Sequence, residues 1–159
     1  MAVNAYLIVD GVPGPSTSLS NAIDILSFSF GASNSAVFGA TASGGESRAG
    51  RADLSNVSIM KVLDKTSPQM FANCVTGDYI NSVDVQYFKA MGTKQDVYFK
   101  IHMEKVVITS VQLSGSNENP TESISFAFAK VKVSYNPEKD GKLQGFIDKG
   151  YDVELLAKW

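Results

Sequence analysis

The side chains that most often carry out chemistry are scarce in this sequence. His102 is the only histidine and Cys74 the only cysteine among 159 residues. A Ser-His-Asp or Cys-His device would have to use His102, which lies mid-strand on the face away from Ile101 and Met103. Such devices need a base that a third group holds in place. We therefore expect His102 to be an exposed, structurally neutral side chain, and we predict no catalytic residue.

Metal and cofactor sites need patterns that the sequence lacks. One histidine and one cysteine cannot form a zinc site of the usual kind. Gly11-Val-Pro-Gly14 and Ser43-Gly-Gly45 read as turn and loop glycines, and no Walker-type or dinucleotide-binding motif is present. Asp64, Asp78 and Asp84 are scattered beside turns and strands, where solvated carboxylates are the default, although a carboxylate-pair hydrolase stays open as an alternative. The prediction is a protein without metal or cofactor that is not an enzyme.

Charge and hydropathy give no case for nucleic acid or membrane. The formal net charge is −2, so no bulk attraction to phosphate is expected. A basic run near the C-terminus is diluted by Glu138 and Asp140, and alternating lysines also protect sheet edges; its members are Lys130, Lys132, Lys139 and Lys142. The apolar run at the N-terminus ends at Asp10, too short for a signal peptide or a transmembrane span. We expect synthesis in the cytoplasm without a standard export signal.

One short helix is expected, over about residues 66–76. Its start and stop signals are a capping hydroxyl, a first-turn proline, a capping-box glutamine and a left-handed glycine, supplied by Thr66 or Ser67, Pro68, Gln69 and Gly77. Its apolar side should consist of Met70, Phe71, Cys74 and Val75. The thiol of Cys74 is then expected to be buried and inert.

Almost everything else reads as strand or turn. Strands are expected over residues 2–9, 23–30, 54–62, 79–91, 95–113, 123–135 and 151–156. Within the second of these, Leu26, Phe28 and Phe30 should face one way and Ser27 and Ser29 the other. A break in alternation near Glu104-Lys105 suggests a bulge. The fold class is mainly β: a single domain over 1–159, built as a small closed barrel of antiparallel strands with one flanking helix.

The long loop over about residues 31–50 stands apart. It consists almost wholly of small and polar residues, with Val37 and Phe38 as its only large apolar side chains. A loop of this length inside a compact domain is usually functional or disordered. Two readings stay open: a floppy insertion, or an arm that orders against a partner with Val37 and Phe38 as its anchor.

Several segments follow one another in a distinctive order. They are Met1-Ala-Val with a strand and turn through Gly14, Ile23 to Gly31, the small-residue loop, Asp53-Leu54 with its strand, Leu63 to Met70, Tyr98 to Val111, Glu122 to Tyr135, and Gly150-Tyr151-Asp152. In this order the chain resembles the haemolysin-coregulated protein (Hcp) family, the tube protein of bacterial type VI secretion. The strand–Asp-Lys-Thr-Ser-Pro–helix unit is the most specific part of the likeness. Phe28 and Phe30 stand where relatives often have tryptophan, a change of volume that should not alter their role.

The resemblance implies a structural subunit that forms six-membered rings, which stack into a hollow tube. Its partners would be further copies of itself, a VgrG-type spike, a contractile sheath that drives the tube out of the cell, and small effectors carried in the lumen. Ser27 and Ser29 are candidates for the lumen wall. The candidate ring-stacking loop contains Val37, Phe38, Gly39, Ser43, Gly44 and Gly45. Two alternatives remain: a tail-tube subunit of a phage-like or extracellular contractile injection particle, and a carbohydrate-binding β-sandwich.

Overall fold

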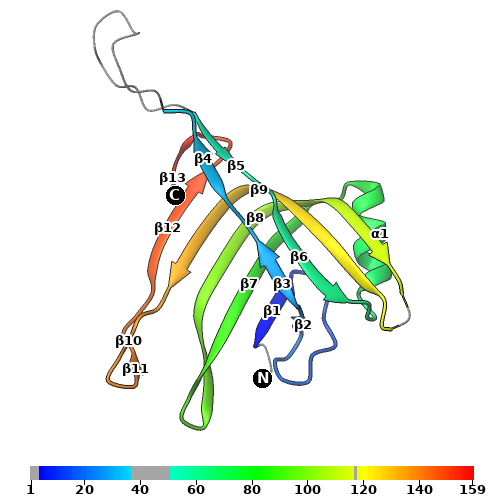
Figure 1. Ribbon diagram of the computed structural model, residues 1–159. Helices are drawn as coiled ribbons and strands as arrows, with labels where there is room; N and C mark the ends of the chain where they lie inside the picture. The colour runs from blue at the N-terminus through cyan, green and yellow to red at the C-terminus, as the bar shows by residue number, and fades with distance from the viewer. Residues whose placement is uncertain (1–3, 37–50, 117) are drawn as a thin grey trace, which may run out of the picture.

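The protein is mainly β, with one helix among the residues that the computed structural model describes, 4–36, 51–116 and 118–159 (Figure 1). In chain order the elements are β1 (Ala5–Val9), β2 (Ile23–Asp24), β3 (Ser27–Ser29), β4 (Ala32–Asn34), β5 (Ala52–Leu54), β6 (Val57–Val62), α1 (Ser67–Thr76), β7 (Ile80–Met91), β8 (Lys94–Ser114), β9 (Thr121–Tyr135), β10 (Glu138–Lys139), β11 (Lys142–Leu143), β12 (Ile147–Asp152) and β13 (Ala157–Lys158). The described part of the chain contains no helix long and apolar enough to cross a membrane.

Three long antiparallel strands, β7, β8 and β9, form the frame of the main sheet. The first part of β9 pairs with β6 and its second part pairs with β12, so that β9 joins two parts of a strongly curved sheet (Figure 1). The sheet order is β13-β12-β9-β8-β7-β1-β2, with β6 beside β9 and β3 beside β6. This order has ends at β13 and β2, so closure into a barrel stays a prediction.

The core follows the alternation of the strands. Its largest fully buried apolar side chains are Phe126, Leu7, Ile23, Ile59, Met70, Ile101, Met103, Ile108 and Ile124. The alternation of buried residues breaks at Lys105, which has φ +53°, but the bulge predicted near Glu104-Lys105 was wrong, because the register with β7 and β9 continues through these residues without a shift. Odd-numbered side chains are buried up to Met103, and even-numbered side chains are buried from Val106 onward. The left-handed conformation of Lys105 reverses which side chains face the core. The shift in pairing register between β8 and β9 lies further along, between Ile108 and Ser110.

The second predicted strand is broken into β2 and β3. The chain leaves β1 and joins β6 at this point: the N–H of Ile25 donates to the carbonyl of Ala5 at 3.2 Å, and the N–H of Leu26 donates to the carbonyl of Met60 at 2.7 Å. This change of pairing partner also changes which side chains face the core. Ile25 is buried and Leu26 is exposed, so the expectation that Leu26 shares a face with Phe28 was wrong.

Helix α1 lies within one residue of its expected limits, but its cap differs. Gly77 has φ +71° and its N–H donates to the carbonyl of Asn73 at 3.0 Å, as the stop signal predicted. The capping box was wrong, because the Thr66 hydroxyl donates to the Asp64 carboxylate and makes no cap bond. Gln69, the expected second member of the box, instead donates to Asn73 Oδ1.

Only part of the expected apolar side of α1 is buried. Met70 is fully buried and Cys74 is half-buried. Phe71 and Val75 remain 53% and 69% exposed. The helix therefore packs on the sheet through a narrower stripe than its sequence suggested, and it leaves an apolar surface pointing away from the sheet.

Candidate functional site

A face rich in serine covers the outside of β3, β6 and β9. Residues directly opposite each other in antiparallel strands share a face. The register produces two rows, Ser29–Ser58–Ser125 and Ser27–Met60–Ser123. The hydroxyl oxygens of Ser58 and Ser125 lie 2.9 Å apart. We call these six residues the serine face; it is uncharged and presents short side chains apart from Met60.

The sequence identified only two members of this surface. Ser27 and Ser29 are exposed, as expected for residues opposite the half-buried Phe28. Ser58, Ser123 and Ser125 were missed, because they join the face only through pairing between strands far apart in the chain. The available signal was the same alternation of serine with apolar residues in β6 and β9.

The predicted stacking loop is described only at its base. Ala32 lies opposite Leu54 and Asn34 opposite Ala52, so that β4 and β5 form a two-stranded ribbon. The expectation of an irregular loop from residue 31 was therefore wrong at its first end, where Ala32–Asn34 form β4. Val37, Phe38, Gly39, Ser43, Gly44 and Gly45 lie outside the described residues.

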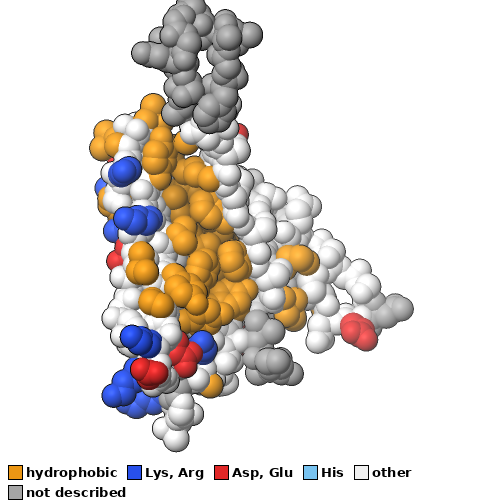
Figure 2. Space-filling view, turned by 60° about the vertical axis from the view of Figure 1, so that its left-hand side comes forward, with side chains coloured by type: hydrophobic (Ala, Val, Ile, Leu, Met, Phe, Trp, Pro, Cys, Tyr) orange, Lys and Arg blue, Asp and Glu red, His pale blue; other side chains and the backbone are white. Residues whose placement is uncertain are grey.

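A row of large apolar side chains crosses the inner face of the main sheet. Tyr87, Phe99, Tyr135 and Ile147 lie opposite one another on β7, β8, β9 and β12, and we call them the aromatic row. Phe28 packs over it, with ring centroids 5.4 Å from Tyr87 and 5.8 Å from Phe99. Burial raises the pKa of the Tyr87 hydroxyl, and nearby Tyr98 adds to the rise. Figure 2 shows apolar side chains gathered into a broad surface on this side of the molecule.

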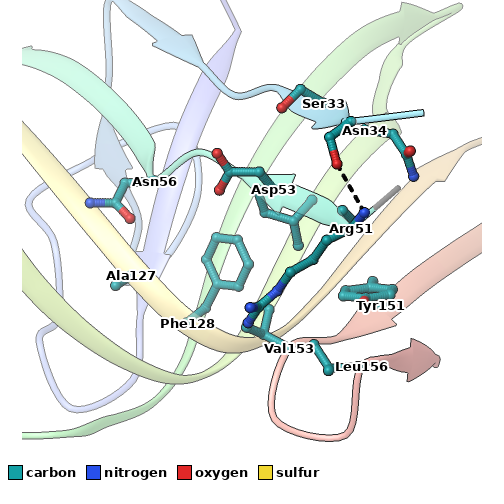
Figure 3. Close-up of a pocket in the computed structure, with 13 residues that line it drawn as sticks. Ser33, Asn34, Arg51, Asp53, Asn56, Ala127, Phe128, Tyr151, Val153 and Leu156 are labelled. Carbon is teal, nitrogen blue, oxygen red and sulfur yellow. Dashed lines mark hydrogen bonds between the residues drawn. The ribbon is translucent and has the colours of Figure 1, made fainter. Parts of the chain in front are cut away.

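A pocket of about 610 Å³ lies beside this surface, under the β4–β5 ribbon (Figure 3). Phe128 and Tyr151 supply aromatic walls, and the side chain of Arg51 extends into the pocket toward Val153. Its lining combines apolar surface with the Arg51 cation, the Asp53 carboxylate and several amide and hydroxyl groups. Such a site suits packing against another protein chain, since it contains no paired nucleophile and base.

His102 is less exposed than expected and has carboxylate partners that the sequence did not indicate. It does lie on the face away from Ile101 and Met103, but its side chain is only 28% exposed. Its Nδ1 contacts the Asp84 carboxylate, and its Nε2 lies 3.3 Å from Glu104 Oε1. Cross-strand register brings these carboxylates beside the ring, which sequence spacing alone did not reveal.

The sequence and the fold match a known family of secretion proteins. A family model described as "Type VI secretion system effector, Hcp" matches residues 6–135. The chain therefore belongs to the Hcp family, the tube proteins of type VI secretion. This is a family of secreted structural proteins and not a known enzyme family.

Individual relatives agree with the family assignment. Protein hcp1 of Pseudomonas aeruginosa is 33% identical over 98 residues, a match that spans 60% of this chain and 60% of that relative. A solved structure described as a type six secretion system protein is 25% identical, with a TM-score of 0.87, covering 99% of this chain and 100% of that chain. Hcp1 from Salmonella typhimurium shares the fold at 24% identity, with a TM-score of 0.81 and full coverage of both chains.

Proposed function

We propose that this protein is the subunit of the type VI inner tube, assembled as hexameric rings that stack. In this proposal the sheath drives the tube out of the cell behind a VgrG-type spike, without a signal peptide, and small effectors travel in the lumen. Family membership over residues 6–135 supports the tube role. The observation that carries the assembly is the broad apolar side that the described chain leaves uncovered (Figure 2). Surfaces of this kind usually mark sites of association.

We also propose that the sheet closes into a barrel. The two residues between β2 and β3 support this, because Ile25 bonds to β1 and Leu26 bonds to β6 through backbone N–H groups. These bonds would link the β1–β2 end of the sheet to β6, which lies beside β9. Closure of this kind removes exposed strand edges, which otherwise promote aggregation.

The first test is the native mass of the purified chain, combined with negative-stain images of the same sample. Six subunits and hollow rings in projection are the expected result. A clean monomer across concentrations would remove the main physical prediction of the proposal. In that case a binding module becomes the better reading, and the aromatic row would be the surface to screen with glycans.

The serine face is proposed to line the lumen. Its uncharged, short side chains would let varied cargo pass without strong attachment. Ser29→Trp should leave the ring mass unchanged and reduce cargo retention, because the indole projects into the channel. Ser20→Trp, at an exposed serine between β1 and β2, is the matched control. If Ser29→Trp changes neither assembly nor cargo retention, the lumen assignment loses its basis.

The loop that includes Val37, Phe38, Gly39, Ser43, Gly44 and Gly45 is proposed to reach the adjacent ring. The β4–β5 ribbon supports this role, because it holds the two ends of the loop together. Deleting Val37–Ser47 should preserve single rings and prevent stacking under conditions in which the wild-type protein forms tubes. Long tubes formed by the deletion variant would contradict the proposal.

A further inference from the structure

We infer that the outward apolar face of α1 in one subunit packs against the aromatic row of the next copy. The inference rests on the proposed ring and names the two surfaces that would form its repeating contact. It is carried by the exposure of both surfaces, by their lack of charge, and by their positions on opposite sides of one molecule.

The outward face of α1 is apolar over its whole length. At 100° per residue, Pro68, Phe71, Ala72 and Val75 fall on one side of the helix, and all four are exposed. The polar Gln69 and Asn73 lie on a different side, bonded to each other. The helix contains no charged residue in its ten positions. A solvent-facing helix surface normally carries charge, so this face has the composition of a covered surface.

The apolar area continues beyond the helix onto the neighbouring strand end. Leu63 and Leu113 line a shallow hollow together with Pro68 and Phe71, and its polar members are Ser67 and Asp64, which pairs with Lys61. Leu113, at the end of β8, is 54% exposed. The contiguous surface is therefore formed by two separate segments of the chain, which gives a partner more to pack on than one helix turn.

The aromatic row is the complementary surface. Tyr135 and Ile147 are 48% and 57% exposed, although they lie in line with the half-buried Phe99 and Tyr87. None of the four carries a charge at neutral pH. Two uncharged surfaces can be desolvated together without leaving an unpaired charge buried, as in the apolar interfaces of obligate homo-oligomers.

The positions of the two surfaces decide the kind of assembly. In Figure 1, α1 lies at the right of the sheet, whereas β12 and the second half of β9 lie at the left. The surfaces therefore cannot meet within one subunit. Because they lie on opposite sides, a single two-fold interface cannot contain both of them. A contact between different surfaces of identical copies is head-to-tail, and repetition of such a contact closes a ring when the rotation fits. A second copy is thus the occupant that satisfies both surfaces at once.

Substitution of the helix face tests the contact. Val75→Glu should abolish the hexamer at a concentration where the wild-type chain is fully assembled, while the circular dichroism spectrum stays native because Val75 is already exposed. Gln69→Glu, a substitution on the polar side of the same helix, is the matched control and should retain the ring. Native mass is the readout. A Val75→Glu variant that assembles like the wild type would overturn the inference.

Cross-linking separates this inference from the proposed function. In a Cys74→Ala background, Val75→Cys is combined with Ile147→Cys or with Tyr135→Cys, and a short bismaleimide is added. A ladder of covalent multimers is expected from either pair, and none from Val75→Cys combined with Leu26→Cys. Native rings that give no ladder from either pair would overturn the contact and leave the tube proposal standing. A monomeric wild-type chain would overturn both.

Discussion

The two sides of the sheet are completed in different ways. On one side the chain's own helix packs against β8, and its first residue, Ser67, helps to enclose charge carried by β6 and β9. Lys61 and Glu122 lie opposite each other, are fully buried and form an ion pair. Ser67 at the start of α1 donates to Glu122 Oε1 at 2.7 Å, and Asp64 Oδ1 lies 3.1 Å from Lys61 Nζ. On the other side, the described chain covers the Tyr87–Phe99 part of the aromatic row with Phe28 and leaves Tyr135 and Ile147 exposed.

This difference has a physical reason. A buried charge is costly unless its partners are already in place, so the partners of Lys61 must come from the same chain. Apolar surface can stay exposed in the subunit and be buried later without such a penalty. We therefore expect the buried side of α1 to determine the stability of the monomer. The exposed end of the aromatic row, together with the outward face of α1 in the next copy, should determine association.

The largest effect should come from breaking the buried ion pair. Glu122→Ala removes one of the two carboxylates beside the buried Lys61 and leaves only Asp64, and it should cost about 3 kcal/mol of unfolding free energy, measured by urea denaturation. The double variant Lys61→Met with Glu122→Leu is the control and should recover most of the loss, because no buried charge remains. A loss below about 1 kcal/mol in Glu122→Ala would contradict the picture of a dry, enclosed pair.

A cavity under the helix should have the next largest effect. Met70 is the fully buried contact of α1, so Met70→Ala should lower the unfolding free energy by about 2–5 kcal/mol. Phe71→Ala, on the exposed side of the same helix, should change monomer stability by less than about 1 kcal/mol. Equal losses in the two variants would show that both faces are buried in the subunit.

Local signals in the sequence were sufficient for the elements themselves. The long strands β7, β8 and β9, the helix limits and the left-handed Gly77 all follow from alternation and turn chemistry. The cap failed because the Thr66 hydroxyl has a competing acceptor in Asp64, which a capping pattern does not consider. The single strand over 23–30 failed because a change of pairing partner is a tertiary event.

The candidate site could be predicted only where one strand reveals it. Ser27 and Ser29 are visible as an alternating pair, whereas Ser58 and Ser125 join them through register. The aromatic row was missed for the same reason, since its four members come from four strands. The charge pair was missed because a lysine within the strand expected over residues 54–62 does not reveal what covers it.

On the uncovered side, stability and assembly should respond separately. Tyr135→Ser removes a half-exposed ring, so the unfolding free energy of the monomer should change by at most about 1 kcal/mol. The ring should nevertheless dissociate at higher protein concentration than the wild type, as seen by native mass over a dilution series. A variant that unfolds readily but still assembles would show that Tyr135 contributes to the stability of the monomer and not to association.

The smallest effect is expected at an ion pair that belongs to neither side. Lys105 donates to Glu154 at 2.7 Å, and this hydrogen bond raises the pKa of Lys105 above its ordinary value of 10.5. A raised lysine pKa contributes stability that is fully present below the unfolded-state pKa and is lost as pH rises through the folded-state pKa. Both side chains are more than half exposed, so water screens the pair. Lys105→Met should therefore shift the urea midpoint far less than Met70→Ala at neutral pH, and the difference from the wild type should vanish in strongly alkaline buffer. A difference that is the same at both pH values would assign the effect to packing of the lysine stem against Tyr79, whose ring centroid lies 5.7 Å from Lys105 Nζ.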